Sequence, residues 1–154
     1  VRAAHANLTS AGAELGLDFR WAGMRRANSH DAHRLLTWAL AAGTPADQHA
    51  LKGRLLRAYF TEHRDIADHA VLARLADEAG LDAASASAVL ASGRFSDEVR
   101  TAEAAGAELG IHAVPTYLIE GTFAIPGAQD PEAFRDLLQR ARHRLAPVVD
   151  ARPR

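Results

Sequence analysis

The chain has 154 residues, a net charge of −1, an apolar content of 48% and no cysteine. This length and composition are typical of a folded domain that needs no disulfide bonds, and they exclude an extensively disordered protein. The nearly balanced charge argues against nucleic acid and against an anionic membrane surface as partners. No apolar run approaches the roughly 18 residues of a membrane span, and the first residues lack the apolar core of a signal peptide. We therefore expect a cytoplasmic protein.

Residues 1–27 are predicted to form a linking helix followed by an extended segment. Alanine-rich residues 3–15 favour a helix that ends at Gly16, because glycine commonly follows the last helical turn. Residues 17–21 alternate between apolar and polar side chains, a pattern that fits either a short strand or an extended link.

Residues 28–109 are predicted to form a helical domain. Apolar residues recur there at helical spacing, and Thr44 and Ser96 are capping residues at two of the expected helix starts. Thr44 is followed by Pro45, and proline favours the first helical position. The expected helices span about 30–42, 45–63, 68–79, a short stretch that begins at Asp82, and 97–109.

Residues 110–146 are predicted to form a hairpin and a final helix, with residues 147–154 as a loose tail. Two short runs of β-branched and aromatic residues, 116–119 and 122–125, flank Glu120-Gly121. This pattern predicts two strands that are joined by a two-residue turn. Asp130-Pro131 then marks the start of the last helix. The predicted fold class is α+β and mostly α.

The stretch GIHAVPTYLIEGTFAIPGAQ at residues 110–129 is the most informative part of the sequence. Its order of helix end, Val114-Pro115, strand, tight turn, strand and glycine-rich bend resembles the cis-proline loop of thioredoxin-like proteins. The helical region is in turn similar to the domain inserted into the thioredoxin fold in the FrnE-like branch of the DsbA family. The similar segments are NSHDAHRL at 28–35, LLRAYFTE at 55–62, DIAD at 65–68, AGLD at 79–82 and EVR at 98–100.

This resemblance implies a helical insertion domain together with the C-terminal half of a thioredoxin-like fold. It also implies protein disulfide oxidoreductase activity, with Val114 and Pro115 presenting their backbone to the substrate. His112, Ala113 and Thr116 would line the same groove. The expected partners are protein or peptide thiols, with glutathione as an alternative, and no cofactor or metal is implied. For self-association, a homo-oligomer and a strand-swapped dimer are both open.

The missing cysteines are the main departure from the family pattern. The first strand and the Cys-x-x-Cys helix of the family precede everything that this sequence matches, so no catalytic residue is assigned within the chain. Because thiol-disulfide exchange needs a thiolate, residues 1–154 alone are expected to be inactive. Three explanations are open: a piece of a longer enzyme, a naturally truncated relative, or an unrelated α-rich binding domain.

Two other functions remain open at this point. Relatives of the 2-hydroxychromene-2-carboxylate isomerase type share the helical insertion and the cis-proline loop, and they use a serine with glutathione. A non-catalytic binding remnant would keep only the groove. The residues that precede Val1 in the gene would separate these functions from the oxidoreductase.

Two further features have testable structural consequences. His30 and His33 have the i, i+3 spacing that metal sites use, but no third ligand is apparent, and a surface pair is the preferred interpretation. An apolar strand at residues 116–119 would leave an edge that invites pairing. We expect this edge to be covered by another chain, by a swapped element or by residues 17–21.

Overall fold

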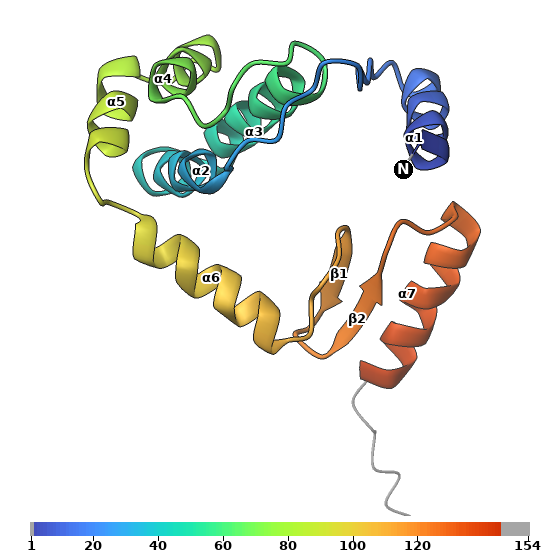
Figure 1. Cartoon of the computed structure of the whole chain (residues 1–154). Coiled ribbons are helices and arrows are strands. Elements are labelled where there is room, and N and C mark those ends of the chain that lie inside the picture. Colours follow the sequence, from blue (N-terminus) through green and yellow to red (C-terminus); the bar gives the residue numbers. More distant parts are fainter. Residues whose placement is uncertain (1, 146–154) are drawn as a thin grey trace, which may run out of the picture. The chain divides into compact units, whose positions relative to one another are not determined.

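A computed structural model describes residues 2–145 of the chain, and the predicted tail at 147–154 lies outside them. Figure 1 shows a mostly helical protein with one small antiparallel sheet, in agreement with the predicted fold class. The elements in chain order are α1 (Arg2–Glu14), α2 (His30–Ala42), α3 (Pro45–Phe60), α4 (His69–Glu78), α5 (Ala83–Ala91), α6 (Ser96–Glu108), β1 (Thr116–Ile119), β2 (Phe123–Pro126) and α7 (Pro131–Leu145).

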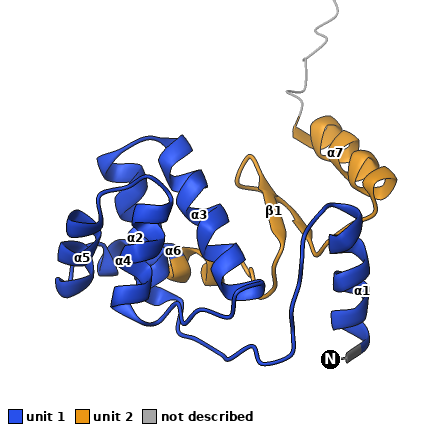
Figure 2. Ribbon diagram, turned by 90° about the horizontal axis from the view of Figure 1, so that it is seen from above, with its two compact units in different colours: residues 1–102 blue, residues 103–154 orange. Residues whose placement is uncertain are grey.

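The chain divides into two compact units, residues 1–102 and residues 103–154, which are coloured separately in Figure 2. The border falls inside α6. The domain borders that the sequence suggests, at 27/28 and 109/110, stay predictions. Within residues 2–145 no helix is both long enough and apolar enough to cross a membrane.

Local capping explains where α3, α4 and α5 begin. At the start of α3, the Asp47 backbone N–H donates to Thr44 Oγ1 at 3.3 Å, and the Thr44 backbone N–H donates to Asp47 Oδ2 at 2.7 Å. These reciprocal bonds form a capping box that satisfies two otherwise unpaired donors. Asp68 and Asp82 cap α4 and α5 in the simpler way, each by accepting one backbone N–H.

The core of the first unit lies among α2, α3, α4 and α5, where α2 contacts α3 and α5, and α4 contacts the same two helices. Its large, fully buried side chains come from all four helices. Trp38 is also buried, with a relative exposure of 6%. Burial of one such leucine or valine stabilises the fold by roughly 1.5–3 kcal/mol. The large residues that are fully buried in this core are Leu35, Leu51, Leu72, Leu75 and Val89.

The structure corrects one predicted helix end in the first unit. α3 ends at Phe60 rather than His63, because His63 has a φ of 56°, outside the right-handed helical region. The Arg64 N–H then donates to the Ala58 carbonyl at 2.9 Å and closes the helix end. Residues 17–21 form an extended link, which is one of the two forms expected from their sequence. Their Arg20 N–H donates to the Phe60 carbonyl at 2.9 Å and attaches the link to the end of α3.

The second unit contains the hairpin and α7. β1 and β2 pair in antiparallel register from Thr116 opposite Pro126 to Ile119 opposite Phe123. The Tyr117 ring lies 4.7 Å from the Phe134 ring of α7, measured between centroids, so the helix packs on one face of the hairpin.

The connection between β1 and β2 is one residue longer than predicted. Glu120 and Gly121 both have positive φ, and the Thr122 N–H donates to the Ile119 carbonyl at 3.1 Å. Thr122 therefore closes the turn, and β2 begins at Phe123 rather than Thr122. The sheet of the described residues has these two strands alone, and the expected cover of the β1 edge stays a prediction.

Candidate functional site

The candidate site lies in the loop between α6 and β1, and the end of α6 fixes where this loop begins. Gly110 has a φ of 72°, which favours glycine. Its N–H donates to the Ala107 carbonyl at 2.9 Å, and the Ile111 N–H donates to the Gly106 carbonyl at 3.0 Å. This pair of bonds is a Schellman motif. It ends the helix and directs residues 111–115 away from it.

Two hydrogen bonds hold the loop in place at its centre. The Val114–Pro115 peptide bond is cis, the geometry expected from the sequence. The Pro115 carbonyl accepts from the Gly127 N–H at 2.7 Å, so the loop is attached to the residue that follows β2. Thr116 Oγ1 donates to the Ala113 carbonyl at 2.7 Å and closes the loop on its other side.

Val114 is the exposed residue at the tip of this loop, with a relative exposure of 90%. Within residues 2–145, neither its backbone N–H nor its carbonyl makes a hydrogen bond. Both groups are therefore available to an extended chain, which can pair with free backbone groups as an added strand does. His112, Ala113 and Pro115 are exposed beside it, and Thr116 is half-buried.

Two residues that support the loop were not among the residues predicted for the site. Gly127, with a φ of 78°, supplies the N–H that fixes Pro115. Gln129 Nε2 donates to the Pro126 carbonyl at 2.7 Å and holds the end of β2. Both residues belong to the Ile-Pro-Gly-Ala-Gln segment at 125–129, which is part of the stretch that resembles thioredoxin-like proteins, but the pattern assigns neither of them a role.

Comparisons with known proteins bear on the family of the chain. The family model described as "DSBA-like thioredoxin domain" matches residues 1–139. The chain belongs to this family. The solved structure of a Streptomyces coelicolor protein, described as the probable DsbA oxidoreductase SCO1869, is similar to this chain. It covers 95% of the chain with 33% sequence identity and a TM-score of 0.84. The uncharacterized protein YwbO of Bacillus subtilis strain 168 is 39% identical over 87 residues, which is 56% of this chain.

The chain spans 62% of the length of the Streptomyces protein and 43% of the length of YwbO. The DSBA-like family is of the thiol-disulfide oxidoreductase type. This chain of 154 residues contains no cysteine, and the thiolate is the nucleophile of thiol-disulfide exchange.

The histidine pair of α2 does not form a metal centre in the part of the chain that the structure describes. His30 Nε2 lies 2.9 Å from Ser96 Oγ, and that contact joins the start of α2 to the start of α6. His33 is exposed on the next turn. No group of three or more histidine, cysteine, aspartate or glutamate side chains gathers within residues 2–145.

Proposed function

We propose that this chain supplies the substrate-holding part of a protein thiol-disulfide oxidoreductase of the DsbA type and the FrnE-like branch. The single observation that carries the proposal is the free backbone of Val114 on a loop fixed by the Gly127 and Thr116 hydrogen bonds. Membership of the DSBA-like thioredoxin domain family supports the reaction type. The name of the Streptomyces protein supports the same reaction for a relative that shares the fold.

The proposed role of the loop is to align an extended substrate segment. The Val114 N–H would donate to a substrate carbonyl, and the Val114 carbonyl would accept from a substrate N–H. In thiol-disulfide exchange a thiolate attacks one sulfur of a disulfide, a new S–S bond forms, and the other sulfur leaves as a thiolate. These three sulfur atoms must lie nearly in line, so a fixed substrate backbone favours the reaction by orientation.

A binding measurement tests the proposed role without needing a thiol in the chain. The probe is reduced, S-methylated insulin B chain, whose blocked thiols cannot exchange disulfides. We expect its addition to shift the amide NMR signals of Ala113, Val114 and Thr116. Val114→Pro removes the backbone donor and should weaken this binding, whereas Val114→Ala keeps the donor and serves as the matched control. Equal binding by the two variants, or shifts confined to other residues, would contradict the proposal.

An activity measurement tests the reaction itself. The 154-residue chain is expected to give no insulin reduction above buffer, because it contains no thiolate source. The coding sequence on the 5′ side of Val1 should then be read and its complete product assayed. A Cys-x-x-Cys segment with insulin reduction would support the proposal. A serine at that place with glutathione-dependent isomerisation would overturn it.

A further inference from the structure

Gly53 is a residue that neither the fold nor the proposed function explains. It lies in the interior of α3, where glycine destabilises a helix relative to alanine. Its φ is not in the left-handed region, and apart from its chain neighbours and the backbone of its own helix, no described atom lies within 4 Å of a Cβ built on it. Backbone conformation and internal packing therefore leave room for a side chain at this position. A residue that breaks a local rule without such a reason points to a functional constraint.

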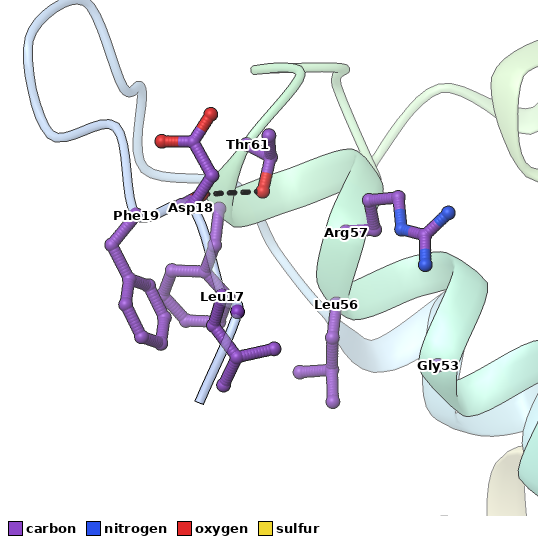
Figure 3. A pocket seen from close by; sticks show the side chains of 9 residues that line it. Leu17, Asp18, Phe19, Gly53, Leu56, Arg57 and Thr61 are labelled. Carbon is purple, nitrogen blue, oxygen red and sulfur yellow. Dashed lines mark hydrogen bonds between the residues drawn. The ribbon is translucent and has the colours of Figure 1, made fainter. Parts of the chain in front are cut away.

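Gly53 lines a hollow of about 490 Å³ within the first unit, between α3 and the extended link that follows α1. Figure 3 shows Leu17 and Phe19 on one side of this hollow and Leu56 and Gly53 on the other. Leu17 and Leu56 have relative exposures of 53% and 49%, so their apolar surfaces are open to a ligand. The volume lies within the range of small-molecule sites.

The wall formed by the link is held firmly against α3. Thr61 Oγ1 donates to the Asp18 carbonyl at 2.6 Å, the bond drawn in Figure 3. The Phe19 ring packs edge-on against Phe60, with 5.7 Å between the ring centroids. The hollow is therefore bounded by fixed residues on both sides.

The positively charged side chain of Arg57 lies beside Gly53 on α3. Arg57 is four residues after Gly53, and helical side chains lean toward the N-terminus of their helix, so Arg57 extends over Gly53. Figure 3 shows its guanidinium on that side of the helix. Within residues 2–145 Arg57 forms no ion pair, whereas the Asp18 carboxylate of the same hollow is bound by Arg20 at 2.7 Å.

We propose that this hollow binds a small organic acid with an apolar body. The apolar body would lie between Leu17 and Leu56, and the carboxylate would contact the Arg57 guanidinium above the bare backbone of Gly53. The free cation selects an anionic head group, and the leucine side chains favour an apolar body. A side chain at position 53 would occupy the space that the acid needs.

Titration of the 154-residue chain with octanoate, followed by amide NMR shifts of α3 and residues 17–19, tests this site. Octan-1-ol has the same apolar chain without the charge and is expected to bind about fivefold more weakly, the factor of one exposed ion pair. Arg57→Gln should weaken octanoate binding by a similar factor. Lys52→Gln removes the same charge from a neighbouring residue of α3 that does not line the hollow, and it should leave binding unchanged.

Gly53→Leu provides the steric test. Leucine favours the helix over glycine, so this variant should unfold at a higher temperature than the wild type while its octanoate binding is lost. Gly53→Ala should raise the unfolding temperature in the same way and keep part of the binding. Octanoate that fails to bind the wild type, binds no better than octan-1-ol, or binds Gly53→Leu as well as wild type would each overturn the proposal.

Discussion

Arg34 has a structural role that the sequence did not reveal. It is 5% exposed, and its guanidinium donates to the Val89 carbonyl at 2.6 Å and to the Arg94 carbonyl at 2.9 Å. It also bonds to the Ser92 carbonyl and to Asp31 Oδ1. The apolar periodicity of α2 identifies Leu35 and Ala39 as inward residues, but it assigns a charged residue to the surface. The carbonyl groups that Arg34 binds belong to residues at least 55 positions further along the chain, so no local sequence pattern reveals these contacts.

We expect replacement of Arg34 to destabilise the protein strongly. Arg34→Met would leave several buried or half-buried carbonyls and Asp31 without their donor, at a cost of roughly 2–4 kcal/mol. Arg34→Lys should recover little of this, because a single ammonium cannot reproduce the planar set of guanidinium donors. Chemical denaturation measures the loss. Arg74→Met, at an exposed position of α4, is the control and should change the unfolding free energy by less than about 0.5 kcal/mol.

Thr116 is the residue of the candidate site whose side chain makes a specific bond. Its hydroxyl donates to the Ala113 carbonyl at 2.7 Å. Thr116→Val keeps the shape of the side chain and removes this bond, and it should cost about 1 kcal/mol of unfolding free energy. Thr116→Ser keeps the hydroxyl and should lose less. Faster amide exchange around residues 113–116 in the valine variant alone would confirm that the bond holds the loop, and equal exchange in both variants would contradict it.

At the scale of elements, the helices of residues 28–109 could be predicted closely because their limits depend on local signals. The expected span 30–42 coincides with α2, and the expected start at Pro45 coincides with that of α3. The end of α3 and the start of β2 could not be predicted. They depend on His63 and Glu120, two non-glycine residues with positive φ that no sequence pattern marks.

The caps of α4 and α5 predict how the helices respond to acid. Hydrogen bonds from the Ser85 side chain and backbone lower the pKa of Asp82 below its ordinary value of 3.8, and the backbone N–H of Val71 does the same for Asp68. A carboxylate whose pKa is lowered by folding stabilises the protein above its unfolded pKa, and this contribution disappears as the pH falls through the folded pKa. We therefore expect the stability from these caps to be complete above about pH 5 and to decline below about pH 4.

Asp82→Asn isolates this effect. Asparagine also caps helices but does not titrate, so the variant should unfold at nearly the wild-type temperature at low pH and respond less to pH between 2 and 5. Thermal unfolding followed by circular dichroism at several pH values measures the difference. Parallel pH curves for the two proteins would show that the cap contributes no acid sensitivity.

For the whole molecule, the sequence predicted the family and the loop at Val114-Pro115 because both depend on the order of short motifs. It did not predict Gly127 and Gln129 as supports of that loop, because their partners are backbone groups that only the folded hairpin brings near.

Burial is also distributed unequally between the two units. Among the described residues 103–145, only Ile125 and Ala141 are buried, whereas α2–α5 share a continuous apolar core.

This inequality predicts different local stabilities along the chain. A two-stranded sheet is marginal by itself, and segments with few buried contacts open at lower free energy than the core. We expect amides of residues 116–126 to exchange with deuterium at least about tenfold faster than amides of α4 and α5, which corresponds to about 1.4 kcal/mol. Mass spectrometry of peptides from these segments measures the rates. Equally slow exchange would contradict the prediction. If the slow exchange of residues 116–126 were lost on tenfold dilution, a second copy of the chain would be covering the free edge of β1.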